Sequence, residues 1–190
     1  MQPLELYIHI PFCVKKCAYC DFLSGPAGEK EKEEYVKMLV DEIRNCPDTV
    51  QNYRVISIFF GGGTPSLLTG EQIGRLMDTV REIFTLDEDA EITMEMNPGT
   101  VTEEKLRKYR QAGVNRLSIG LQSVNDEELR LLGRIHTYEE FLEAYHLART
   151  NGFANINVDL ISAIPGADGG KLEAYTGAGN GTFPGAYFCI

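Results

Sequence analysis

Strand-like and helix-like segments alternate along most of this chain. Amphipathic runs with apolar residues at helical spacing separate β-rich runs. The β-rich runs are at 4–10, 53–60, 90–98, 114–123 and 156–166, and the helical runs at 31–46, 70–84, 103–113 and 137–152. Such alternation predicts an α/β domain with a parallel sheet and right-handed crossovers. Both an open doubly wound sheet and a barrel satisfy it.

Polar residues and glycines gather where each expected strand ends. Three cysteines follow the first strand, and the sequence GGGTP follows the second. The later strands carry, in chain order, Glu95 and Asn97, then Gln122, then Asp159. Sites built this way lie on the carboxyl face of a barrel or at a switch point of an open sheet. We favour a partial barrel.

The stretch YIHIPFCVKKCAYCDF contains three of the five cysteines: Cys13, Cys17 and Cys20. Three thiolates on one loop can bind three irons of a 4Fe–4S cluster and leave the fourth iron open for a small molecule. One alternative is a zinc site completed by His9 or Asp21, although zinc prefers a fourth ligand with its own spacing motif. The other alternative is that the thiols bind nothing. We favour the cluster.

Composition indicates a globular protein of the cytoplasm. Hydrophobic residues make up 43% of the 190 residues, an ordinary globular value. No apolar run approaches the roughly 18 residues of a membrane span. The first residues, MQPLELYIHI, lack the basic and apolar regions of a signal peptide. We therefore expect a cytoplasmic location without a membrane span. The net charge of −10 argues against nucleic acid as a partner.

The last part of the chain differs from the rest. We expect a core over 1–166 and a flexible glycine-rich tail over 167–190, which carries six glycines. A sharper hypothesis is that the reading frame shifts after Gly166. Dropping one base there permits the helix-forming string QMEESWKHTLEQ, and the codons of 186–190 permit PISA, the start of another strand. The nucleotide sequence decides between the two.

The motifs together resemble a known family. The cysteine motif with Tyr19 before its last cysteine, followed by GGGTP, resembles the signature of radical S-adenosylmethionine (SAM) proteins. The segments FFGGGTPSLL, MEMNP, RLSIGLQS, LGRIHT and NVDLISAIPG are similar to the oxygen-independent coproporphyrinogen III oxidase group, over residues 4–166. The resemblance implies an incomplete (β/α)6 radical SAM barrel, truncated after about five strands and without the C-terminal domain of longer members.

The resemblance also implies cofactors. A 4Fe–4S cluster on the three cysteines would bind SAM through its open iron, and an electron donor such as flavodoxin or ferredoxin would reduce it. Cleavage of the sulfonium would then give a 5′-deoxyadenosyl radical that abstracts a substrate hydrogen. The residues implied to contact the cofactor are Gly62, Gly63 and Thr64 at its amino group, Glu95, Gln122 and Asp159 at its polar groups, Arg134 at its carboxylate, and Tyr7 and Tyr19 as packing partners.

Phe22 indicates a branch of this family. Coproporphyrinogen dehydrogenases carry a further cysteine at this position, two residues after the last cluster ligand. The C-D-F form resembles the haem-chaperone branch, whose members bind haem and deliver it to respiratory proteins. We therefore expect haem or porphyrin and haem-accepting respiratory proteins as partners. The alternative is oxidative decarboxylation of coproporphyrinogen III to protoporphyrinogen IX. An RNA-modifying radical enzyme comes third, because the acidic charge disfavours it. The sequence identifies no haem ligand.

Overall fold

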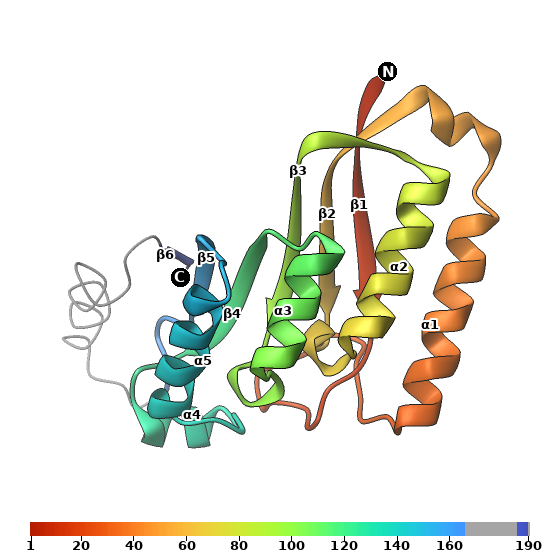
Figure 1. The fold of residues 1–190 in the computed structure, drawn as a ribbon. Helices are drawn as coiled ribbons and strands as arrows, with labels where there is room; N and C mark the ends of the chain where they lie inside the picture. The colour runs from red at the N-terminus through yellow and green to blue at the C-terminus, as the bar shows by residue number, and fades with distance from the viewer. Residues whose placement is uncertain (166–185, 190) are drawn as a thin grey trace.

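Parallel strands form one sheet in which the spatial order equals the order along the chain (Figure 1). The computed structural model describes residues 1–165 and the backbone of 186–189. Within these residues the sheet has six strands: β1 (Gln2–Ile10), β2 (Tyr53–Gly62), β3 (Thr85–Met96), β4 (Arg116–Gln122), β5 (Asn155–Leu160) and β6 (Ala186–Cys189). All neighbouring pairs are parallel, so every strand ends at the same edge of the sheet.

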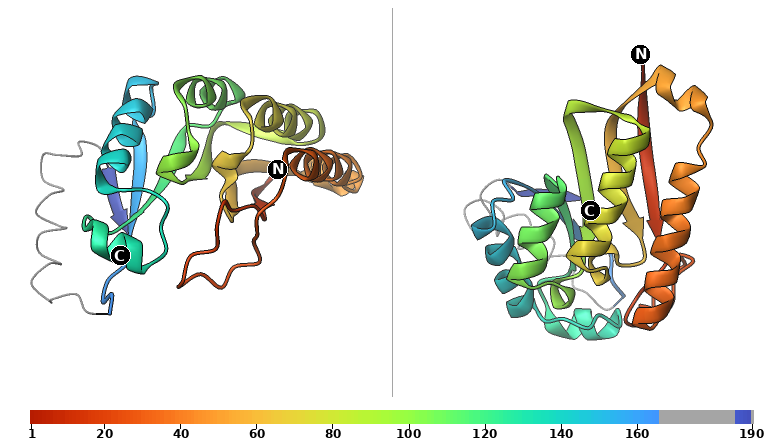
Figure 2. Two further views of the ribbon diagram at one scale, coloured as in Figure 1. Left: turned by 90° about the horizontal axis from the view of Figure 1, so that it is seen from below. Right: turned by 45° about the vertical axis from the view of Figure 1, so that its right-hand side comes forward.

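Helices connect the strands along one side of this sheet. They are α1 (Glu29–Arg44), α2 (Gly70–Ile83), α3 (Glu103–Ala112), α4 (Asp126–Leu131) and α5 (Tyr138–Thr150), with 3-10 turns η1 (Asp48–Asn52), η2 (Pro65–Leu67) and η3 (Pro98–Thr100). Right-handed crossovers between successive strands place every helix on the same face. The left view of Figure 2 shows the result, an open arc of strands with helices along its outer side. The strand order has no reversal, which confirms the partial barrel and excludes a doubly wound sheet.

The five expected strands are present, although some bounds differ and β5 ends at Leu160 rather than at residue 166. β3 begins at Thr85 rather than at residue 90, and α4 was not anticipated because six residues are too few to show a helical stripe. The backbone of Ala186–Cys189 adds a short sixth strand beside β5. The boundary after residue 166, and the proposed frame shift there, lie outside the described residues and stay predictions.

The two faces of the sheet differ in chemistry because strand side chains alternate. On the convex face, apolar side chains are buried against the helices, among them Phe60, Met94 and Ile119. On the concave face the alternate positions carry polar groups such as Glu95 and Asp159. The hydrophobic core therefore lies between the sheet and the helices, and the concave side is left for polar chemistry.

Two N-caps fix where the loops at the carboxyl edge end. Thr69 caps α2: it accepts a hydrogen bond from the Gln72 amide at 3.2 Å, and the Gln72 side chain accepts one from the Thr69 amide at 2.9 Å. Thr102 caps α3 by accepting from the Lys105 amide at 3.3 Å. At the other end of α3, Gly113 ends the helix with a φ of 107°. The N-caps limit the conformations open to the loops before them, and the glycine sets the turn into β4.

Each helix within 1–165 is too short or too polar to cross a lipid bilayer.

Leu76 tests the location of the core. Its side chain is fully buried on α2 at the convex face. Leu76→Ala should lower the free energy of unfolding by about 2–5 kcal/mol, because it leaves a cavity that the packed neighbours cannot fill. Met38→Ala on α1, where the side chain is 68% exposed, should change it by less than about 0.5 kcal/mol. Urea unfolding of the two variants measures the difference, and equal losses would contradict this placement of the core.

Candidate functional site

A cleft with a volume of about 180 Å³ opens at the carboxyl ends of the strands. Its walls come from the loop after β1, the loop after β2, the ends of β3, β4 and β5, and the segment after α4. All the predicted site residues except Tyr7 line it: Cys13, Cys17, Tyr19, Cys20, Gly62, Gly63, Thr64, Glu95, Gln122, Arg134 and Asp159. The structure therefore brings together residues from five strands that are far apart in the sequence.

Tyr7 lies outside the cleft lining, on the strand β1 itself. Its side chain is 60% exposed, its ring stacks on Phe59 with centroids 6.0 Å apart, and its hydroxyl lies 3.3 Å from His9 Nδ1. Burial and the nearby Glu95 charge both raise the pKa of Tyr7. Tyr7 thus borders the site from the concave face, and its contact with a cofactor stays a prediction.

The cysteine loop, residues 11–25, is closed at its base by backbone hydrogen bonds. The Cys13 amide donates to the Gly25 carbonyl at 2.9 Å, and the Gly25 amide donates to the Pro11 carbonyl at 3.0 Å. At its far end the Ala18 amide donates to the Leu132 carbonyl at 3.0 Å. The loop is therefore anchored at both ends, and its three thiols are unpaired with any other cysteine.

The chemistry of three thiols on one loop suits the separate irons of a cubane cluster. Zinc draws its ligands to a single atom, whereas each cysteine of a cubane binds a different iron. Of the two residues suggested to complete a zinc site, His9 lies against Gly62 with its Nε2 3.4 Å from the Leu23 carbonyl, and Asp21 is exposed outside the cleft lining.

The surroundings of the sulfur atoms also suit thiolates. Thr64 Oγ1 donates to Cys13 Sγ at 3.6 Å, and Arg134 Nη1 donates to Cys17 Sγ at 3.8 Å. Donors to the sulfur ligands are one of the means by which proteins adjust the reduction potential of iron–sulfur clusters.

The glycine loop, residues 63–69 after β2, packs directly on the base of the cysteine loop. The Gly63 amide donates to the Ile10 carbonyl at 2.8 Å, and the Thr64 amide donates to the Phe12 carbonyl at 2.7 Å. A Cβ at Gly63 would lie 2.5 Å from the Phe12 carbonyl oxygen, so no larger residue fits without moving the backbone. This close approach is the physical reason for glycine at this position.

The pKa values of two carboxyl groups in the cleft are raised. Burial raises the pKa of Glu95 to about 7, and the charge of Asp159 adds to the effect, while the Gly62 amide, which donates to Glu95 at 3.0 Å, opposes it. Burial also raises the pKa of Asp159, although Ser118 and Asn157 donate to its carboxylate at 3.1 and 2.6 Å. Hydrogen bonds from the ammonium or hydroxyl groups of a ligand would favour the charged form of these carboxyl groups and lower their pKa values.

Arg134 is a cationic group held inside the cleft by several contacts. Its Nη2 donates to the Gly120 carbonyl at 2.7 Å and to Asn97 Oδ1 at 3.0 Å, and its Nη1 lies 3.4 Å from the Tyr19 hydroxyl. Among the described residues it forms no ion pair, although its charge lowers the pKa of Asp159, and its buried Nε has no partner. A guanidinium with an unused donor suits a ligand carboxylate.

Gln122 carries backbone strain at the end of β4. Its φ is 73°, a left-handed conformation that residues with a side chain rarely adopt, and the register of β4 against β5 shifts at this point. Strain of this kind is often found at functional sites. Here it coincides with a side chain that lines the cleft.

Sequence reasoning left several lining residues out of the site. The sequence marks Asn97 only as a polar residue at the end of a strand. Its hydrogen bond with Arg134 could not be predicted from residue spacing. Ser118 and Asn157, which orient Asp159, occupy inward-facing positions on β4 and β5. The period of two along each strand was the signal that could have identified them. The cleft is also lined by Val14, Lys15, Lys16, Phe22, Met96, Gly120 and Ile135.

Comparison with known proteins gives consistent results. The model of the radical SAM superfamily matches residues 7–175. Over 166 residues the chain is 48% identical to the heme chaperone HemW of Escherichia coli, and over 170 residues 41% identical to that of Haemophilus influenzae, each time over 87% of this chain. The structure of the E. coli coproporphyrinogen III oxidase HemN, a radical SAM enzyme, is similar over all of this chain with a TM-score of 0.87 and 33% identity. The chain spans 44% of the length of each of these proteins.

Glu95 should give the unbound protein a pH dependence of stability. Its folded pKa of about 7 lies above the ordinary value of 4.5, so the folded state holds the proton more tightly than the unfolded state. The free energy of unfolding should therefore fall as pH rises from about 4.5 to about 7 and then level off. Glu95→Gln should remove this part of the slope, whereas Glu91→Gln, exposed on the same strand, should keep it. Urea unfolding at a series of pH values measures this slope. Parallel plots of unfolding free energy against pH for the wild type and Glu95→Gln would contradict the prediction.

Proposed function

The chain belongs to the radical SAM superfamily, and on that premise we propose that Cys13, Cys17 and Cys20 hold a 4Fe–4S cluster beside SAM in the cleft. The observation that carries the proposal is the meeting of three free thiols, a glycine loop and the Arg134 guanidinium in one cleft. Residues 1–166 are the proposed SAM-binding core.

Each lining residue has a role that its chemistry supports. When bound, the cluster supplies the electron for reductive cleavage of SAM. The backbone at Gly62 and Gly63 allows a ligand amino group to approach closely, and Glu95 accepts hydrogen bonds from the ligand's ammonium or hydroxyl groups. Arg134 binds the ligand carboxylate and at the same time donates to Cys17 Sγ.

The remaining lining residues complete the ligand's surroundings. Thr64 donates to Cys13 Sγ and so orients one cluster ligand. Gln122 and Asp159 bind the ligand's remaining polar groups, and the Tyr19 ring covers one side of the site. Tyr7 closes it from the concave face.

We further propose that the protein acts as a haem chaperone, binding haem or a porphyrin and delivering haem to acceptor proteins in the cytoplasm or at respiratory complexes. Two observations support this: the identity to the heme chaperones named HemW, and Phe22 in place of the cysteine of the dehydrogenases. A donor such as flavodoxin or ferredoxin would reduce the cluster.

The second candidate is oxygen-independent coproporphyrinogen III dehydrogenase. The structural similarity to HemN, with its TM-score of 0.87, favours it. An RNA-modifying activity has weaker support, because the net charge of −10 opposes binding to a phosphate backbone.

Iron content tests the cluster ligands. After anaerobic reconstitution, Cys13→Ser, Cys17→Ser and Cys20→Ser should each lose most of the bound iron and the broad visible absorbance of the cluster, because the hydroxyl is a poor ligand for this iron. Cys46→Ser is the matched control: this free cysteine lies outside the cleft, and its variant should bind iron as the wild type does. Zinc in place of iron, or equal iron in all four variants, would contradict the assignment.

Haem binding and porphyrinogen turnover separate the two candidate functions. The reconstituted wild type should bind haem, seen as a shifted Soret band in a titration, and should form no protoporphyrinogen from coproporphyrinogen III with SAM and a reductant. Protoporphyrinogen detected by fluorescence after oxidation would favour the dehydrogenase instead. An absence of both signals from a cluster-loaded protein would contradict both functions for this chain.

A further inference from the structure

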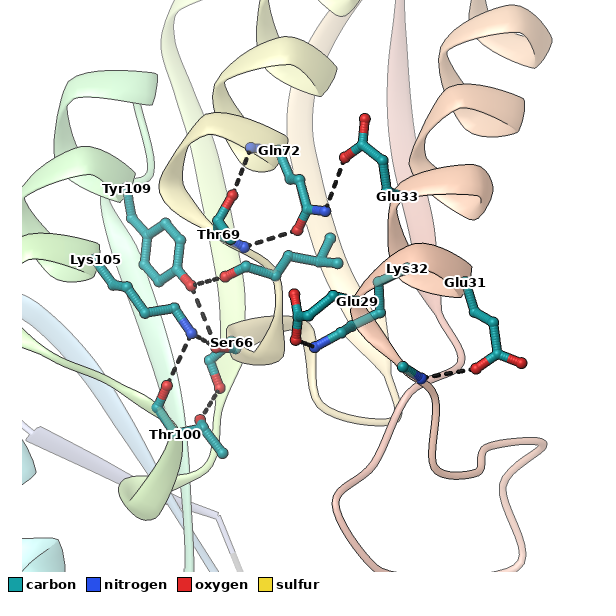
Figure 3. A network of polar contacts seen from close by, with 12 residues as sticks. Glu29, Glu31, Lys32, Glu33, Ser66, Thr69, Gln72, Thr100, Lys105 and Tyr109 are labelled. Atoms are coloured by element: carbon teal, nitrogen blue, oxygen red, sulfur yellow. Dashed lines mark hydrogen bonds and ion pairs between the residues drawn. The ribbon is translucent and has the colours of Figure 1, made fainter.

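Two loops that form the cleft are joined behind it by a buried polar network, which Figure 3 shows. The first is the glycine loop, residues 63–69 after β2. The second is the Asn97 loop, residues 97–102 after β3. Each contributes to the cleft at its beginning, through Gly63 and Thr64 in one case and Asn97 in the other. The parts of the network that lie deeper, at Ser66, Thr100, Lys105 and Tyr109, are absent from the cleft lining.

The two loops bond to each other directly at Ser66, which is fully buried. Ser66 Oγ lies 2.6 Å from Thr100 Oγ1 and accepts from the Asn97 amide at 3.2 Å. Thr100 Oγ1 also lies 2.7 Å from the Asn97 carbonyl, to which it donates. The position of Asn97, and through it that of Arg134, thus depends on Ser66 in the glycine loop.

Helix α3 supplies two further donors from one face. Lys105 Nζ donates to the Ser66 carbonyl and, at 2.9 Å, to the Thr100 carbonyl, so a single ammonium spans both loops. The Tyr109 hydroxyl donates to the Leu68 carbonyl at 2.6 Å and lies 3.3 Å from the Ser66 carbonyl. Residues four apart share a helix face, which places these donors one turn apart along the loops.

The ammonium at Lys105 is unfavourable for stability taken alone. Burial lowers the pKa of Lys105 to about 8, the nearby charge of Lys32 on α1 lowers it further, and Glu29 opposes the shift. No carboxylate of the described residues forms an ion pair with Lys105. A partly buried cation held by two carbonyls contributes little to stability. It does fix the distance between the two carbonyl groups, because both oxygens must stay within hydrogen-bond reach of one nitrogen.

We propose that Lys105 and Tyr109 are positioning residues for the two loops and thereby set the affinity for SAM without touching the ligand. Lys105 fixes the spacing between the glycine loop and the Asn97 loop, and Tyr109 holds the glycine loop against α3. The proposal rests on the SAM binding proposed above. It predicts that loss of Lys105 loosens both loops and that loss of the Tyr109 hydroxyl loosens the glycine loop, while the far end of the cysteine loop, where Ala18 bonds Leu132, is unchanged.

The experiment compares SAM affinity in four anaerobically reconstituted variants. Lys105→Met and Tyr109→Phe should bind SAM roughly tenfold or more weakly at unchanged iron content, as loss of outer-shell support commonly does. Lys105→Arg should recover most of the affinity, since a guanidinium can also donate to two carbonyls. Arg107→Met, exposed on the same helix, is the control and should bind as the wild type does. The change in the cluster's electron paramagnetic resonance signal during a SAM titration reports the affinity.

Hydrogen exchange of the protein without cofactors gives a second readout. Peptides covering 63–69 should exchange faster in both Lys105→Met and Tyr109→Phe, and peptides covering 97–102 should exchange faster in Lys105→Met, whereas a peptide covering 14–23 in the far part of the cysteine loop should not. Wild-type affinity and exchange in both variants would overturn the proposal, and so would equal losses in Lys105→Met and Lys105→Arg. If Lys105→Met fails to fold, Tyr109→Phe, which removes one hydroxyl, decides. A wild type that binds no SAM would instead refute the proposed function, and the exchange measurement would still test the spacing.

Discussion

The site depends on one backbone contact, the docking of the glycine loop onto the end of β1. Gly63 and Thr64 donate their amides to the carbonyls of Ile10 and Phe12, and Gly63 has no Cβ to prevent the approach. This contact sets where the cysteine loop leaves the sheet. It therefore fixes the distance between the sulfur atoms and the glycine loop, the two parts that any ligand of an open iron must touch together.

The sheet provides the rest of the site by simple geometry. Because all strands are parallel and wound in sequence, their ends meet at one edge, and the helices leave the concave face free (Figure 2). Arg134 then links the walls, since one guanidinium contacts Cys17, Tyr19, Asn97 and Gly120. Glu95 and Asp159 stay uncharged more readily than in water, so their ionisation can respond to a cationic ligand.

Most of the residues expected at the site meet in one cleft because their positions follow from the ends of parallel strands. Polar residues that end parallel strands must meet, and the caps at Thr69, Thr102 and Gly113 obey local rules. The sequence was less informative about contacts between residues far apart in the chain and about residues behind the cleft lining. Tyr7 lies three residues before the end of β1, below the edge, and the bond of Arg134 to Cys17 joins residues 117 positions apart. The network at Ser66 is likewise invisible to spacing, since its donors come from α3.

The difference between the two candidate functions reduces to the chemistry available at the mouth of the cleft. Phe22 lies in the cysteine loop, lines the cleft and is 65% exposed. A thiol at this position would offer an exchangeable hydrogen, whereas a phenyl ring has none and offers only an apolar surface. A flat, largely apolar ring system can pack on such a surface. The exposed ring therefore favours the proposed binding of a tetrapyrrole over its conversion.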